Sequence, residues 1–145
     1  MWMDVKYEPG TLKVVAYDDN GKAVAEKKMV TAGKPHHIKL EADRQTISAN
    51  GVDLSYVTAT IVDKQGNPCP TASNRLYFEV KGKGKYRAAC NGDATSLEVF
   101  HEPTMKAFNG KLVILVQSTA IPGDIELMVS GDGLRKEKMK LASIE

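Results

Sequence analysis

Residues 93–102 contain the side chains of this sequence that could carry acid–base chemistry. His101 and Glu102 are adjacent, and Glu98 and Asp93 lie a few residues upstream. Two carboxyl groups perform general acid–base catalysis only when a cleft moves the pKa of one away from that of the other. No feature of the sequence predicts such a cleft, so we expect solvated loop side chains here and no catalytic residue.

Two other patterns associated with catalysis are incomplete. Ser96 lacks the flanking glycines of a nucleophile elbow. Gly82 and Gly84 are followed by a strand pattern and not by a helix, so they do not form a phosphate-binding loop. The sequence therefore predicts neither a catalytic residue nor a cofactor.

Two short motifs contain residue types that bind metals, and neither is expected to hold an ion. His36 and His37 are adjacent, and neighbouring side chains of a strand point to opposite faces, so a solvated linker pair is favoured. Asn91-Gly92-Asp93 offers too few oxygens for the six to eight ligands that calcium takes. We favour a turn of the Asx type, in which a side chain caps the nearby backbone.

The two cysteines, Cys69 and Cys90, do not define a disulfide framework. Cys69 lies between Pro68 and Pro70 in a turn, and Cys90 ends a strand pattern. A disulfide bond would be geometrically possible if these two strand ends met. Small buried thiols are the favoured interpretation, because free cysteine commonly packs as a small hydrophobic residue.

Aromatic side chains on exposed strand faces could stack on sugar rings. Tyr56 and Tyr77 fall on the expected outer faces of their strands, which makes them candidate glycan-stacking residues. Such aromatics also serve as cross-strand pairs within a sheet. The second interpretation is favoured, because a sugar platform needs several aromatics on one face and the aromatic content is only 6%.

Composition indicates one ordinary domain, or one small domain and a fragment. The 145 residues are 42% hydrophobic and carry a net charge of +2, which argues against disorder and provides no basic patch for nucleic acid. No apolar run approaches the roughly 18 residues of a membrane span. The first five residues lack the pattern of a signal peptide and look like the middle of a strand, so we expect the natural chain to extend upstream.

Alternating residues predict a hairpin near the N-terminus. Residues 11–18 alternate well, residues 22–31 form the expected return strand, and Asn20-Gly21 between them is a dipeptide typical of type I′ turns. A hairpin of this size is not stable alone in water. We therefore expect residues 1–35 to be the C-terminal hairpin of a truncated upstream β-sandwich module.

Residues 36–145 predict an immunoglobulin-like β-sandwich of about seven strands, so the whole chain is all-β. Strand patterns bounded by turn residues recur every 8–12 residues, and no segment has the helical period. The expected strands lie within residues 38–43, 55–63, 76–80, 85–90, 111–117, 125–129 and 134–141.

Residues 93–107 form the long irregular segment of this pattern. Turn signals stand at both ends, namely Asn91-Gly92-Asp93 and Asn109-Gly110, and a strand apolar on both faces follows at residues 111–117. Long ordered loops in compact domains are usually functional or packed against a neighbour. We therefore expect a docking or spacing loop, whose candidate contact residues are Ser96, Glu98, Phe100, His101 and Glu102.

Several motifs together resemble a known family. The first motifs are Tyr7-Glu8-Pro9-Gly10-Thr11-Leu12, Asn20-Gly21-Lys22 and Thr31-Ala32-Gly33-Lys34-Pro35. The later ones are Leu40-Glu41-Ala42-Asp43-Arg44, Asp53-Leu54-Ser55-Tyr56-Val57, Val62-Asp63-Lys64-Gln65-Gly66-Asn67-Pro68, Asn91-Gly92-Asp93 with Thr95-Ser96, and Lys106-Ala107-Phe108-Asn109-Gly110. Nearly the whole chain resembles the C-terminal accessory region of bacterial β-galactosidases of glycoside hydrolase family 2, with an invasin-like character. Cys69 and Cys90 depart from the family pattern, where apolar residues are expected.

The resemblance implies an ancillary part of a multidomain exo-glycosidase from a gut bacterium of the Bacteroidetes type. It implies that the catalytic glutamates lie in a barrel domain outside this sequence, so no catalytic residue transfers to this chain. It also implies a periplasmic, cell-surface or secreted parent protein. The expected role is a non-catalytic module that packs against or spaces other domains of the parent enzyme, and the alternative is a carbohydrate-binding module for galactoside-containing glycans.

Overall fold

The computed structural model describes residues 6–145, and its regular secondary structure there consists of strands alone. The chain forms two compact units, Met1–Ala32 and Gly33–Glu145, and each is described by itself. The expectation that residues 1–35 derive from a truncated upstream module stays a prediction. No helix of the described residues is long and apolar enough to cross a membrane.

The first unit contains an antiparallel hairpin of β1 (Thr11–Tyr17) and β2 (Ala23–Val30). Cross-strand pairs such as Leu12 with Met29 place apolar side chains on one face, as the alternation predicts. The turn differs from the type I′ prediction: Gly21 has a φ of 76°, Asn20 does not have a positive φ, and the Gly21 amide donates to the Asp18 carbonyl. This is a type I turn that ends in a left-handed glycine.

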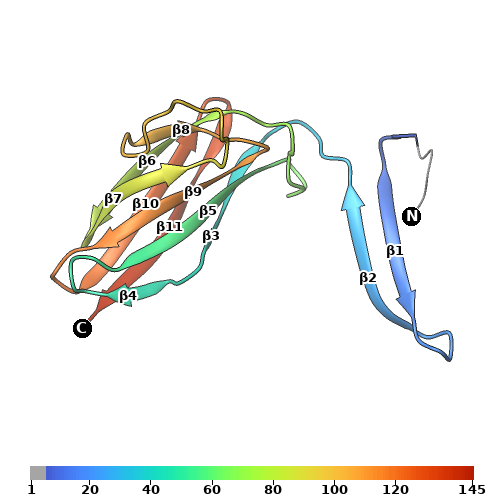
Figure 1. The fold of residues 1–145 in the computed structure, drawn as a ribbon, viewed down its shortest axis with the longest axis horizontal. Helices are drawn as coiled ribbons and strands as arrows, with labels where there is room; N and C mark the ends of the chain where they lie inside the picture. Colours follow the sequence, from blue (N-terminus) through green and yellow to red (C-terminus); the bar gives the residue numbers. More distant parts are fainter. Residues whose placement is uncertain (1–5) are drawn as a thin grey trace. The chain divides into compact units, whose positions relative to one another are not determined.

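The second unit is an immunoglobulin-like β-sandwich of two layers (Figure 1). The first layer has the order β7-β9-β5-β3, and the second has β11-β10-β6-β8, with β4 paired to β11. The strands are β3 (His37–Ala42), β4 (Thr46–Ser48), β5 (Leu54–Val62), β6 (Arg75–Gly82), β7 (Gly84–Cys90), β8 (Thr104–Lys106), β9 (Lys111–Ser118), β10 (Gly123–Gly131) and β11 (Leu134–Ile144). A parallel bridge between His37 and Arg135 joins the layers along one side.

The described strands of this unit number nine, and the two that the sequence pattern missed are β4 and β8. Each has only three residues, which is too short to show an alternation. β4 pairs in parallel with β11, and β8 pairs with the start of β6. Because β8 lies within residues 93–107, the irregular part of that expected loop ends at Pro103.

The core lies between the layers and is formed by the inward side chains of both. Val57, Ala59 and Ile61 of β5 are fully buried, as predicted. β9 is apolar on both faces, but the two faces differ in burial, because Ile114 is completely buried whereas Leu115 on the other face is only half-buried. The reason is that β9 lies in the middle of one layer, whose outer face has no second layer above it.

Candidate functional site

The β7–β8 loop, residues 91–103, begins with two successive side-chain caps. The Asn91 Oδ1 atom accepts a hydrogen bond from the Asp93 amide at 3.0 Å. Asp93 Oδ1 in turn accepts from the Thr95 amide at 2.9 Å and from the Thr95 hydroxyl at 2.7 Å. Gly92 provides the positive φ, 77°, that reverses the chain between them. The first turn of the loop is therefore of the Asx type.

The far end of the loop is hydrogen-bonded to the sandwich. The Ala89 amide donates to the Phe100 carbonyl at 2.7 Å, and the Phe78 amide donates to the Pro103 carbonyl at 2.9 Å. The Tyr86 hydroxyl lies 2.9 Å from the Phe100 carbonyl oxygen and 2.7 Å from that of Glu102, so its proton is shared between them. Partial burial, followed by the charge of Glu102, raises the pKa of Tyr86 to about 12. Tyr86 therefore remains a neutral hydrogen-bond donor under ordinary conditions.

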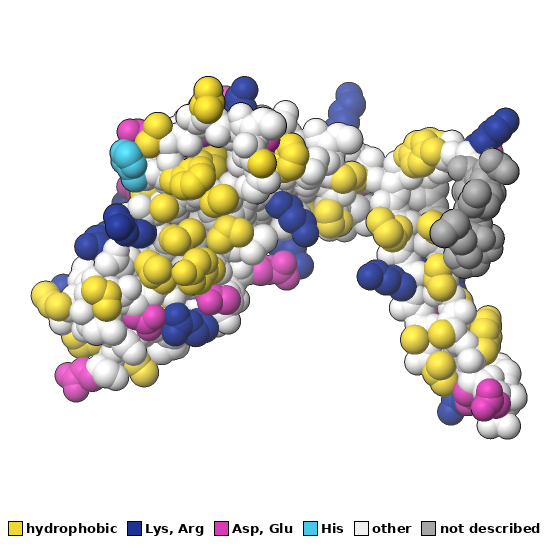
Figure 2. Space-filling view, in the orientation of Figure 1, with side chains coloured by type: hydrophobic (Ala, Val, Ile, Leu, Met, Phe, Trp, Pro, Cys, Tyr) yellow, Lys and Arg dark blue, Asp and Glu magenta, His cyan; other side chains and the backbone are white. Residues whose placement is uncertain are grey.

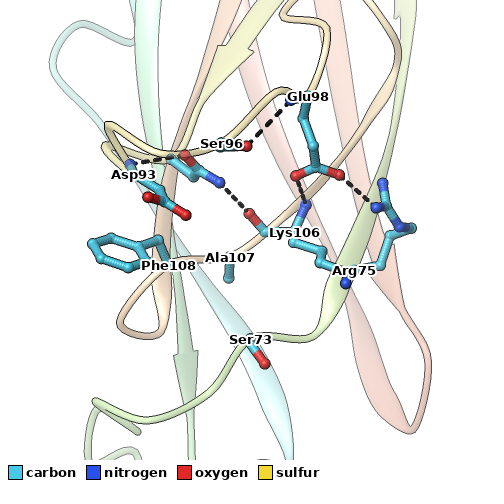
Figure 3. A pocket seen from close by; sticks show the side chains of 9 residues that line it. Ser73, Arg75, Asp93, Ser96, Glu98, Lys106, Ala107 and Phe108 are labelled. Atoms are coloured by element: carbon cyan, nitrogen blue, oxygen red, sulfur yellow. Dashed lines mark hydrogen bonds and ion pairs between the residues drawn. The ribbon is translucent and has the colours of Figure 1, made fainter.

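The middle of the loop is held by Glu98. Its carboxylate forms an ion pair with the Arg75 guanidinium of β6 and accepts the Lys106 amide of β8 at 2.9 Å (Figure 3). Partial burial opposes ionisation, but the hydrogen bonds from Lys106 and Arg75 prevail and hold the pKa of Glu98 below its usual value. Glu98 thus stays charged and fixes the loop to two strands of the sandwich.

The apolar side chains of the same segment face solvent. Leu97 is 98% exposed, Phe100 is 54% exposed and Val99 is 48% exposed. The segment is inverted relative to an ordinary surface loop, because its acid points into the protein and its hydrophobic residues point out. The sequence pattern did not single out Leu97 or Val99, although their alternation with Glu98 was visible in it.

The other expected contact residues have different surroundings. His101 and Glu102 are exposed, next to Phe100. Ser96 is half-buried, and its hydroxyl oxygen accepts the Glu98 amide at 3.2 Å. The structure therefore brings Phe100, His101 and Glu102 together on the surface and assigns Ser96 and Glu98 to the support of the loop.

A polar pocket with a cavity volume of about 320 Å³ lies under the loop, as Figure 3 shows. Glu98 and Arg75 form one end, and Asp93 lies beside the ring of Phe108 at the other. Ser73, from the segment before β6, lines a further wall. Asn91 also lines the pocket, and its side-chain amide donates to the Lys106 carbonyl at 3.0 Å.

The two carboxyl groups of this pocket are unsuited to general acid catalysis. The hydroxyl of Thr95, with its amide, holds the pKa of Asp93 below its usual value, and the pKa of Glu98 is also lowered. A general acid at neutral pH needs the opposite shift. The described residues also contain no group of three or more metal-ligating side chains that could hold an ion.

The second predicted turn, at Asn109-Gly110, connects the pocket to β9. Asn109 has a φ of 50° and Gly110 a φ of 73°, the pair of left-handed residues that a type I′ turn requires. A Cβ atom on Gly110 would lie 2.2 Å from the Cys69 carbonyl oxygen. Glycine is therefore required twice here, for its φ and for the close approach of another segment.

The two tyrosines proposed for glycan stacking lie on opposite faces of the sandwich. Tyr56 points outward from β5 and pairs across the strand with Leu115 of β9. Tyr77 points outward from β6 in the other layer, since Leu76 and Phe78 on either side of it are buried. Hydrophobic side chains gather on the face of β5 and β9 in Figure 2. The two tyrosines cannot form one platform.

The histidine pair and the cysteines also have defined positions. The Nδ1 atoms of His36 and His37 are 3.1 Å apart and their rings meet edge to face. The expectation that the imidazoles point apart is wrong, because His36 precedes β3 and does not follow strand alternation. Both cysteines are free thiols. The prediction of a small buried thiol is confirmed for Cys69 and is wrong for Cys90, which is exposed.

Comparison with known proteins defines the family. The model of glycoside hydrolase family 2 C-terminal domain 5 matches residues 38–140, so the chain belongs to this family. A domain of unknown function (DUF4982) matches residues 1–25.

Relatives with known activities extend this match over both units. The chain is 43% identical over 141 residues to the β-galactosidase BoGH2A of Bacteroides ovatus, covering 97% of this chain and 16% of that protein. It is 28% identical to a β-galactosidase of Thermoanaerobacter pseudethanolicus, covering 94% of this chain and 16% of that protein. The crystal structure of a β-glycosidase from Bacteroides vulgatus matches with a TM-score of 0.89 and 32% identity, covering 95% of this chain and 18% of that chain. The chain spans about a sixth of the length of these relatives.

Proposed function

We propose that this chain is a non-catalytic accessory module of a β-galactosidase-type glycoside hydrolase, and that it packs against other domains of the parent enzyme through the β7–β8 loop. The observation that carries the proposal is the inverted segment 97–100. Exposed apolar side chains gathered on one loop are a candidate interaction site, because large exposed apolar patches mark contacts with other proteins. The hydrogen bonds of Tyr86 and Glu98 hold the backbone beneath them in place, so a partner surface would meet a preorganised loop.

The docking proposal is tested by comparing the full-length parent enzyme with the 145-residue chain. We expect Leu97→Asp to lower the melting temperature of the parent enzyme and to leave that of the isolated chain nearly unchanged. Ile121→Asp is the matched control, because Ile121 is also an exposed apolar loop residue but lies outside the β7–β8 loop. Equal effects of Leu97→Asp and Ile121→Asp in the parent enzyme would refute docking through this loop.

The lack of catalysis is tested separately. The purified 145-residue chain should hydrolyse no aryl galactoside, because both pocket carboxyls have lowered pKa values and neither suits the general acid that glycoside hydrolysis uses. Turnover that survives rigorous purification and is lost in Glu98→Gln would contradict the proposal.

The parent enzyme is proposed to act in the periplasm, at the cell surface or outside the cell. The support is the resemblance to the accessory region of family 2 exo-glycosidases, which implies an exported parent protein. Fractionation of the source cells with an antibody against this module measures the location, and recovery in the cytosolic fraction alone would contradict it.

A further inference from the structure

The pocket under the β7–β8 loop has features that the docking proposal does not use. Its cavity of about 320 Å³ falls at the lower end of the size range of small-molecule sites. Phe108 is 41% exposed and lies at one end of this pocket, next to the Asp93 carboxylate (Figure 3).

Some polar groups of the pocket already form hydrogen bonds or ion pairs within the protein, and others remain free to bind a ligand. The Glu98 carboxylate is occupied by Arg75 and by the Lys106 amide. Asp93 uses only Oδ1 for the cap on Thr95. Within residues 6–145, Asp93 Oδ2 forms no hydrogen bond with the protein and is not a fully buried atom. The Ser73 hydroxyl is also unpaired there, but Ser73 is exposed and its hydroxyl points away from the other lining residues. One strong acceptor therefore remains for a ligand.

The lining of the pocket limits the ligands that suit it. The formal charges of the lining side chains cancel, because Asp93 and Glu98 are matched in number by Arg75 and Lys106, so the formal charge gives no reason to prefer an ion. The described residues provide no third metal-ligating side chain next to the two acids. A ligand that suits the site is neutral, has several hydroxyl groups to donate to the carboxylate, and has an apolar face for the ring.

We propose that this pocket binds one neutral pyranose ring, whose apolar face lies on Phe108 and whose hydroxyls donate to Asp93 Oδ2. A sugar ring has both an apolar C–H face and a rim of hydroxyl donors, which match an aromatic ring and a carboxylate held at an angle to it. The inference does not depend on docking through segment 97–100, because it uses different side chains.

The test is a ¹⁵N NMR titration of the 145-residue chain with methyl β-D-galactopyranoside. We expect saturable shifts of the amides of Asp93, Phe108 and Asn109, with a dissociation constant on the order of millimolar for a single ring. Phe108→Ala should raise this constant at least about tenfold through loss of the ring contact. Asp93→Asn should raise it by about tenfold through loss of a charge-assisted hydrogen bond, while its Oδ1 atom keeps the cap on Thr95.

The matched control is Tyr56→Ala. Tyr56 is 45% exposed, close to the value for Phe108, but lies on the outer face of β5. Tyr56→Ala should leave the dissociation constant unchanged. A loss of binding in Tyr56→Ala would place the site on the outer face of β5 and overturn the proposal. Absence of saturation up to about 50 mM sugar, or tighter binding of glucuronate than of the neutral sugar, would also overturn it. If Phe108→Ala does not fold, Asp93→Asn decides the outcome.

Discussion

The hairpin of β1 and β2 and the sandwich of β3–β11 are built from the same alternating strand pattern, but only the sandwich buries it. The buried apolar side chains of the described residues all lie between Ile38 and Leu141, whereas almost every hairpin side chain is exposed. The apolar hairpin face that includes Leu12 and Met29 has the composition of a core face without a second layer. Alternation therefore predicts which side chains share a face, and burial depends on what covers that face.

The largest expected effect is a difference in hydrogen exchange between the two units. Amides of Val14, Val15 and residues 23–30 should exchange with little protection, because two strands alone bury too little apolar area to be stable. Amides of residues 59–62 should exchange only by global unfolding, a difference of several kcal/mol in opening free energy. Equal protection in the 145-residue chain would show that the hairpin is covered, for example by a second copy of the chain.

Removal of side-chain volume sharpens the same comparison. Ile114→Ala should lower the free energy of unfolding by about 2–5 kcal/mol, because Ile114 is completely buried. Leu115→Ala should cost at least about 1 kcal/mol less, since Leu115 is half-buried. Leu12→Ala in the hairpin should change the free energy of unfolding by no more than about 0.5 kcal/mol. Urea denaturation measures all three, and a cost for Leu12→Ala as large as that for Ile114→Ala would break the comparison.

Glycine substitutions separate backbone conformation from packing. Gly110 and Gly133 share a φ of 73°, but only the Cβ of Gly110 would meet the Cys69 carbonyl. Gly133→Ala should cost about 1 kcal/mol from backbone strain alone, and Gly110→Ala should cost clearly more, about 3 kcal/mol or above. Gly21→Ala in the hairpin, with a φ of 76° and open space around it, is a second strain-only control. Identical costs at Gly110 and Gly133 would refute the close approach.

The smallest expected effect is a contribution to stability that is lost at acid pH, and it concerns Asp63. Its carboxylate accepts hydrogen bonds from the Gly33, Gln65 and Asn67 amides and from the Asn67 side chain. The hydrogen bond from Gly33, then that from the Asn67 side chain, lower the pKa of Asp63 to about 2. A lowered folded-state pKa contributes stability that is present above the unfolded-state value, near 3.9, and is lost as pH falls toward 2.

The variant Asp63→Asn should be less stable than the wild type at neutral pH, and the difference should shrink between about pH 4 and pH 2. Asp19→Asn is the matched control, because Asp19 is an exposed carboxyl in the hairpin turn. The control should follow the wild-type curve throughout. A constant difference for Asp63→Asn down to pH 2 would contradict the assignment of this acid-dependent stability to Asp63.

The local pattern of the sequence determined most of the strands and one of the left-handed turns. Alternation in residues 11–18 and 55–63 reports side-chain direction, because successive residues of a strand point to opposite faces. Asn109-Gly110 forms a type I′ turn because glycine and asparagine tolerate a positive φ. The same dipeptide at Asn20-Gly21 forms a different turn, since the Asp18 side chain accepts hydrogen bonds from the Asn20 and Lys22 amides.

Only the tertiary structure decided the site. The inward direction of Glu98 depends on Arg75, 23 residues away, and on the Lys106 amide. β8 exists because it pairs with β6, and its three residues have no period of their own. The opposite faces of Tyr56 and Tyr77 follow from the assignment of β5 and β6 to different layers. In each case the deciding interaction joins segments distant in sequence, and alternation within one segment contains no information about its partner.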